Sequence, residues 1–104
     1  MFDAVQQAVT FADKHDAWVV VVTPLQGVGV ARKHLSTMVR PGDRYGGRTL
    51  IRDRGRVSVV EARSPVFVPD GTPFHLHLVG WDEKAVEFKE IPRWREAAKS
   101  EIGP

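Results

Sequence analysis

The most informative absence in this chain is cysteine, which does not occur among its 104 residues. Without cysteine, disulfides, thiolate metal sites and cysteine nucleophiles are all excluded. The chain also has no long apolar run, because the longest, residues 17–22, is far shorter than the roughly 20 residues that cross a bilayer. Its beginning lacks the basic start and apolar centre of a signal peptide. We therefore expect a soluble, cytoplasmic protein that does not contact membranes.

Sequence signatures of enzymes are absent as well. The chain contains no G-x-x-x-x-G-K-[ST] loop for binding nucleotide phosphates. None of its serines lies in a nucleophile-elbow motif. The adjacent carboxylates Asp82 and Glu83 fall in an expected turn, where acidic residues are common. We therefore assign no catalytic residue and no cofactor, and we favour a protein that is not an enzyme.

What is present is an ordinary globular composition, with 42% hydrophobic and 27% charged residues. Both fractions are close to the averages of soluble domains. A chain of this length buries roughly two-thirds of its unfolded surface when it folds. We expect residues 1–104 to form a single α+β domain.

The hydrophobic pattern of the first 40 residues predicts a helix, a strand and a second helix. Apolar residues recur at helical spacing over residues 3–14, whereas residues 17–23 are β-branched and apolar on both faces, as in a central strand. Gly27 and Gly29 weaken the first turn of the second helix, so we expect that helix to begin near Gly29. Pro41 and Gly42 end it.

The remainder of the sequence predicts strands joined by tight turns and a final helix. We expect strands at residues 48–52, 56–62 and 65–68, a turn at 69–72, and a hairpin of residues 73–80 and 85–91. Pro92 favours the first turn of a short C-terminal helix that extends to about residue 102. The predicted fold is a two-layer α+β sandwich, in which an antiparallel β-meander follows the N-terminal helix-strand-helix unit.

The same periodicity predicts a set of buried residues. Strand alternation and helical spacing place eight apolar side chains in the core. They are Val20, Val22, Leu35, Val57, Val59, Leu76, Leu78 and Phe88.

Positive charge is concentrated between Arg32 and Arg56. This block holds eight lysine or arginine residues against two acids, a net charge of +6 in a chain whose total is +2. Arginine forms bidentate contacts with phosphates and carboxylates, and a tyrosine among the arginines can stack on a base. Three of the arginines flank the turn at residues 53–55, so we expect them to be displayed together. The candidate binding residues are Arg44, Tyr45, Arg48, Arg52, Arg54 and Arg56.

A second candidate site is the pair His75 and His77. On a strand, residues two apart project from the same face, and two imidazoles there can hold one metal ion that Asp82 or Glu83 completes. A half-exposed strand with polar residues facing water explains the same pattern. We therefore expect no metal at this pair.

These observations favour a binding protein that contacts the nucleic acid backbone or an acidic protein surface through its arginines. One alternative is a phage-type assembly or inhibitor protein, in which a sheet edge and exposed aromatic residues (Trp81, Trp94 and Phe67) contact other proteins or further copies in a homo-oligomer. The other alternative is a small metal-dependent enzyme that uses His75 and His77.

Overall fold

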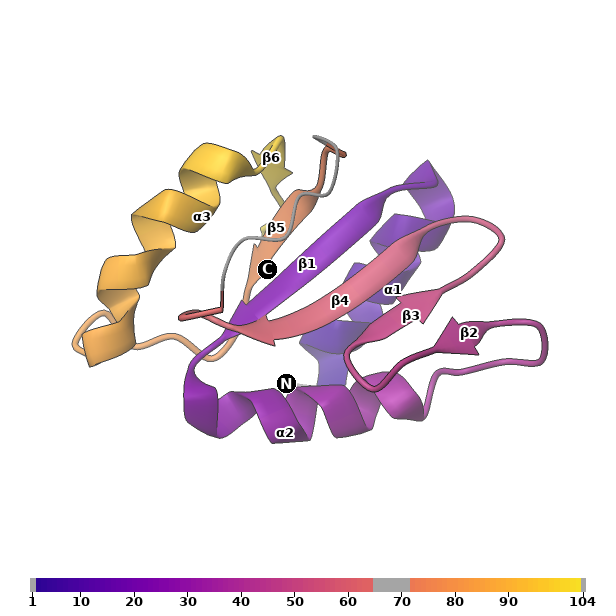
Figure 1. Ribbon diagram of the computed structural model, residues 1–104, viewed down its shortest axis with the longest axis horizontal. Coiled ribbons are helices and arrows are strands. Elements are labelled where there is room, and N and C mark those ends of the chain that lie inside the picture. The colour runs from indigo at the N-terminus through magenta and orange to yellow at the C-terminus, as the bar shows by residue number, and fades with distance from the viewer. Residues whose placement is uncertain (1, 65–71, 104) are drawn as a thin grey trace.

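The computed structural model describes residues 2–64 and 72–103. Within these residues, the strands form one mixed sheet of six in the order β2-β3-β4-β1-β5-β6 (Figure 1). The elements are α1 (Phe2–His15), β1 (Trp18–Thr23), α2 (Leu25–Ser36), β2 (Arg44–Tyr45), β3 (Thr49–Ile51), β4 (Arg56–Glu61), β5 (His75–Leu78), the 3-10 helix η2 (Val86–Glu90), α3 (Ile91–Ala97) and β6 (Ser100–Glu101). The predicted α+β class is confirmed.

β1 is the central strand of the sheet, as its apolar sequence predicts. It pairs in parallel with β4 on one side and with β5 on the other. β6 continues the parallel part beyond β5, whereas β3 is antiparallel to β4, and β2 is antiparallel to β3. Alternate valines of β1 enter two different hydrophobic cores, because successive side chains of a strand point to opposite faces.

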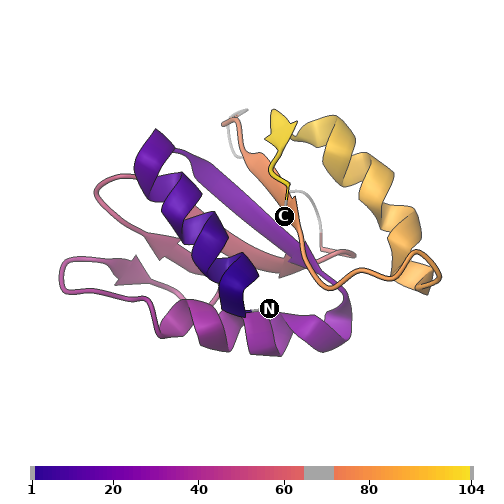
Figure 2. The same cartoon turned by 180° about the vertical axis from the view of Figure 1, so that it is seen from behind.

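Helices cover both faces of the sheet, so the predicted two-layer arrangement is wrong. α1 and α2 pack on the face that carries Val19 and Val21, and α3 packs on the face that carries Val20 and Val22 (Figures 1 and 2). We call these the α1–α2 face and the α3 face. The physical reason is the central strand, which is apolar on both sides and requires cover on both.

The predicted antiparallel meander is only partly present. β2, β3 and β4 form one, but β5 lies beyond β1 and is parallel to it. Strand alternation shows which face a side chain occupies and leaves the neighbouring strand undetermined. The expected strand at residues 65–68 lies outside the described residues, as does most of the expected turn at 69–72.

The predicted hairpin of residues 73–80 and 85–91 is also wrong. Only His75–Leu78 is a strand, and residues 86–90 form η2, which continues directly into α3. Phe88 packs edge-on against Trp81, with 6.0 Å between ring centroids, so tertiary contact overrides the local alternation. After α3 the backbone becomes extended at Ala98 and enters β6, where the sequence predicts more helix.

Two further expectations concern the second helix and the core. α2 begins at Leu25, four residues before Gly29, and Gly27 is buried in its first turn. Six of the eight predicted core residues are buried, and Leu78 and Phe88 are partly buried against the core.

None of the helices in the described part of the chain has the length and hydrophobicity that crossing a bilayer requires.

Candidate functional site

The sheet separates the predicted arginine site into two groups. Strand register aligns Arg44 with Ile51, Ile51 with Arg56, and Arg56 with Trp18. Residues in register on neighbouring strands project from the same face. Trp18 and Ile51 line a groove on the α3 face, so the row of Arg44, Ile51, Arg56 and Trp18 belongs to that face.

Tyr45 belongs to the opposite face. It is in register with Leu50, which is part of the core beneath α1 and α2. Its hydroxyl oxygen is 3.1 Å from the carbonyl oxygen of Gly47 and 3.4 Å from that of Arg32. These contacts hold Tyr45 against its own loop, away from the row on the α3 face.

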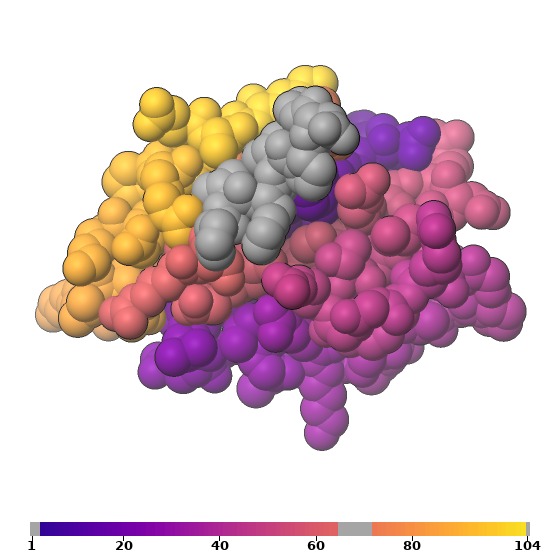
Figure 3. Space-filling view, viewed as in Figure 1, coloured from indigo at the N-terminus to yellow at the C-terminus, as the bar shows by residue number. Residues whose placement is uncertain are grey.

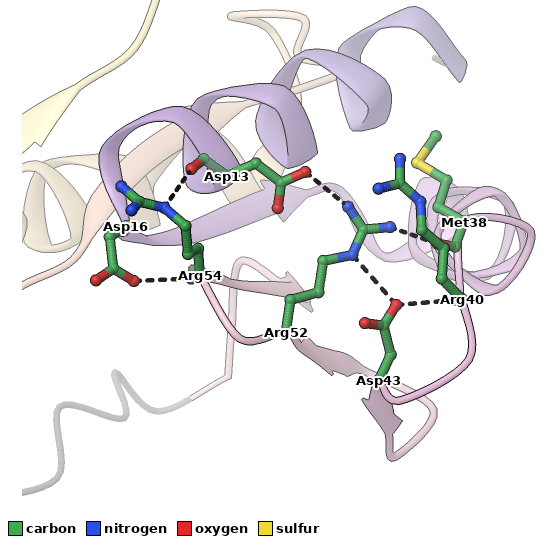
Figure 4. Close-up of polar contacts among 8 residues, drawn as sticks. Asp13, Asp16, Met38, Arg40, Asp43, Arg52 and Arg54 are labelled. Carbon is green, nitrogen blue, oxygen red and sulfur yellow. Dashed lines mark hydrogen bonds and ion pairs between the residues drawn. The ribbon is translucent and has the colours of Figure 1, made fainter.

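Arg52 also lies on the α1–α2 side, where its guanidinium joins three segments (Figure 4). Its Nη1 donates to Asp13 of α1 at 2.9 Å, and its Nε donates to Asp43 before β2 at 3.2 Å. Its Nη2 donates to the carbonyl oxygen of Met38, which follows α2. Only 9% of the Arg52 side chain is exposed. The expectation that Arg52 is displayed with Arg54 and Arg56 is therefore wrong, because two carboxylates and a carbonyl enclose it.

The turn between β3 and β4 packs against the end of α1. The Gly55 N–H donates to Asp16 Oδ1 at 3.0 Å, and Arg54 Nε lies 3.4 Å from the Asp13 carbonyl oxygen (Figure 4). Gly55 has a φ of 92°, and a Cβ there would lie 2.4 Å from the Ala12 carbonyl oxygen. Glycine is thus required both by the backbone conformation and by the close approach of α1. Arg54 stays exposed at the tip of this anchored turn.

Arg56 lies over an aromatic ring. Its guanidinium carbon lies 4.8 Å from the centroid of the Trp18 ring, within the range of a cation–π contact. Within residues 2–64 and 72–103, no carboxylate forms an ion pair with Arg56. The indole therefore holds the guanidinium in place, and no ion pair within the described residues neutralises its charge.

A groove of about 330 Å³ lies beside this row on the α3 face. We call it the face groove. Figure 3 looks onto the α3 face, with α3 to one side and the β2–β3 region to the other. The floor of the face groove is mainly apolar, and two hydroxyl groups and two arginines supply its polar atoms. The lining residues are Trp18, Val20, Arg48, Thr49, Ile51, Arg56, Ser58, Val60 and Trp94.

Hydrogen bonds fix the polar part of the face groove. Trp18 Nε1–H donates to Ser58 Oγ at 3.0 Å, and the hydroxyls of Ser58 and Thr49 are 2.9 Å apart. Trp94 is held at the other side, where its Nε1–H donates to the Ala62 carbonyl oxygen at 2.8 Å. Both indoles are thus oriented by the protein itself, which pre-organises the groove.

His75 and His77 project from the same face, as expected, but their surroundings differ. His75 Nδ1 lies 2.6 Å from Ser100 Oγ, whereas His77 is 3% exposed and its Nδ1 lies 3.2 Å from the Ile102 carbonyl oxygen. In the described part of the chain, no three histidine or acidic residues are grouped so as to hold a metal ion. The two histidines instead attach the C-terminal segment to β5.

The aromatic residues of the assembly alternative are not exposed as a set. Trp94 is 1% exposed, which corrects the expectation for that residue. Trp81 is half-buried and donates from Nε1 to the Val22 carbonyl oxygen at 2.9 Å. Phe67 lies outside the described residues.

Sequence reasoning missed Trp18, Thr49 and Ser58 as members of a site. A tryptophan that starts an apolar strand, and hydroxyl residues inside strands, are ordinary features of a sheet. Only the register that aligns Thr49 with Ser58, and Trp18 with Arg56, brings them together.

Comparison with known proteins returned no match. No protein-family model, no curated protein and no solved structure is significantly similar to this chain. Function must therefore be argued from the chemistry of the site.

Proposed function

We propose that this protein binds nucleic acid, without catalysing a reaction, through the arginines of its α3 face and of the β3–β4 turn. The observation that carries the proposal is the row in which Arg44, Ile51, Arg56 and Trp18 stand in register. Adjacent strands are about 4.8 Å apart, so Arg44 and Arg56 start roughly 10 Å from each other. Arginine side chains from these two positions can reach different phosphates of one backbone.

The contact residues in this proposal are Arg44, Arg48, Arg54 and Arg56. Arg44, Arg48 and Arg54 are exposed, and Arg56 is half-buried on the Trp18 ring. Arg52 acts differently from its neighbours: it holds α1 and the two loops together and thereby positions the turn that carries Arg54. Phosphate contacts of this kind give affinity with little sequence preference.

The neighbouring groups favour nucleic acid over an acidic protein surface. Carboxylates of a protein partner would require only cations, whereas the face groove combines cations with an indole and with hydroxyl groups. Aromatic rings beside arginines are typical of sites that bind exposed bases. An acidic protein partner is the competing outcome of the experiment.

The test is fluorescence anisotropy with labelled single-stranded and duplex DNA and RNA over a range of salt concentrations. We expect the variant with Arg44→Ala, Arg54→Ala and Arg56→Ala to bind much more weakly than the wild type. Its salt dependence should fall by about 0.9 for each duplex phosphate that the variant no longer binds, and by about 0.7 for each phosphate of a single strand.

A matched control removes the same charge elsewhere. Lys14, Lys84 and Lys89 are exposed and lie outside the arginine row, so their replacement by alanine should leave most of the affinity. Equal losses of affinity in the two triple variants would reduce the effect to net charge and contradict the assigned surface. If the wild type binds none of the four nucleic acids at low salt, the proposal is wrong. A pull-down of acidic proteins with the same variants then tests the competing partner.

A further inference from the structure

A second pocket adjoins the face groove at the ends of the strands. Its volume is about 400 Å³, and it shares Trp18, Ile51 and Arg56 with the groove. We call it the end pocket, because β1, β4 and β5 all begin there. Each volume falls within the range of small-molecule sites, roughly 300–1,000 Å³.

The end pocket is polar and carries an excess of basic groups. It is lined by Arg56, Lys99, His15 and His75, and by the already paired Arg52. The acids that line it are Asp16, which accepts the Gly55 N–H, and Asp53. Burial lowers the pKa of His75, and the nearby Lys99 and His15 lower it further. Neighbouring positive groups thus disfavour a further positive charge on the His75 imidazole. A bound anion would reduce this repulsion.

The two cavities differ in chemistry and share one cation. The face groove has the half-buried indole of Trp18, aliphatic side chains and the hydroxyls of Thr49 and Ser58, whereas the indole of Trp94 is almost fully buried. A flat heterocycle can stack or pack there and use its edge for hydrogen bonds. Arg56 stands between this groove and the end pocket, where its guanidinium can hold a phosphate in bidentate fashion.

We propose that the face groove and the end pocket together bind one nucleotide unit, with the base in the groove and its phosphate in the end pocket against Arg56 and Lys99. The proposal rests on the proposed function and deepens it, because a base must be unpaired to enter the groove. Single-stranded nucleic acid is then preferred to duplex. A free nucleotide has the same chemistry, so the experiment separates the two sources.

The experiment compares the wild type with two variants. Thr49→Phe places a ring in the face groove without changing charge, and Lys99→Ala removes an exposed cation of the end pocket. Thr10→Phe, at an exposed position of α1, is the control for the added ring. The probes are a labelled single-stranded oligonucleotide, the corresponding duplex, and nucleosides with and without a 5′-phosphate, the last two followed by quenching of tryptophan fluorescence. Circular dichroism and thermal melting verify that each variant folds.

We expect Thr49→Phe to weaken single-strand binding about tenfold or more, the value of one base–aromatic contact. Duplex binding should change far less, and Thr10→Phe should change neither. Lys99→Ala should weaken binding of the nucleoside 5′-phosphate and leave binding of the nucleoside unchanged. This variant retains the groove, so it tests the proposal even if Thr49→Phe does not fold.

The outcomes distinguish this proposal from the proposed function. If the triple arginine variant loses binding but Thr49→Phe and Lys99→Ala bind single strands like the wild type, the nucleotide site is wrong and the phosphate-binding surface stands. If no polymer binds but a nucleoside 5′-phosphate quenches the fluorescence and both variants reduce the quenching, the site is supported for a free nucleotide and the proposed function fails. Equal affinity of the wild type for single strand and duplex also overturns the nucleotide site.

Discussion

The two faces of the sheet are built from the same strands and are covered differently. On the α1–α2 face, Val19, Val21, Val57 and Val59 are all buried beneath two helices. On the α3 face, α3 covers Val20, Val22 and Leu76, while the adjoining part carries Arg56, Ser58 and Thr49 in the face groove. The comparison shows that β4 contributes the buried Val57 and Val59 to one side and a mixed, partly accessible layer to the other. Binding chemistry can therefore be carried on one face without weakening the core on the other.

The largest expected effect is a loss of folding stability, and it should differ between the covered and the accessible parts of the sheet. Leu35 and Leu76 are fully buried, one on each face, so Leu35→Ala and Leu76→Ala should each lower the free energy of unfolding by about 2–5 kcal/mol. Ile51, in the groove, is only half-buried, and Ile51→Ala should cost about 1 kcal/mol or less. Urea denaturation measures all three, and a destabilisation at Ile51 as large as that at Leu76 would contradict the groove.

The second prediction concerns two arginines on either side of one turn residue. Arg52→Ala leaves Asp43, whose side chain is 10% exposed, without its cation, and should cost about 3 kcal/mol. Arg54 is exposed at the turn, and Arg54→Ala should change stability by no more than about 0.5 kcal/mol. The same denaturation series tests the pair. Similar small effects for both would show that the Arg52 hydrogen bonds contribute little to folding.

The smallest expected effect is a pH dependence of stability at the end pocket. His75 has a pKa below its ordinary value of 6.5, because of burial and the nearby Lys99 and His15. Folding therefore favours the neutral imidazole. The stability that this contributes is present above the unfolded pKa and is lost as pH falls through the lower folded pKa.

Thermal melting between about pH 7.5 and about pH 5.5 tests this shift. The wild type should lose more stability on acidification than His75→Gln, and the two proteins should keep a constant difference at the alkaline end. Parallel melting curves over the whole range would contradict the lowered pKa. A bound phosphate should reduce the acid sensitivity of the wild type, since it stabilises the protonated ring.

The structure also explains which parts of the fold could be predicted from the sequence. The first helix, the central strand and the Pro92 helix start are local signals, because periodicity and proline geometry act within a few residues. The segment predicted to pair with β5 in a hairpin instead forms η2, in which Phe88 packs against Trp81, a contact that a local pattern does not reveal. Strand order and the number of layers depend on contacts between distant segments, and these are not encoded in any short window.

For the candidate site, the sequence by itself determined that positive charge is concentrated in one segment, that thiol chemistry is absent and that the central strand is apolar on both faces. Only the tertiary structure decided which arginines share a face. Arg52 and Arg56 are four residues apart, yet a turn separates them, so one is enclosed by Asp13 and Asp43 while the other lies on Trp18. The physical reason is that charge is a property of residues, whereas its availability depends on register and on partners brought from distant parts of the chain.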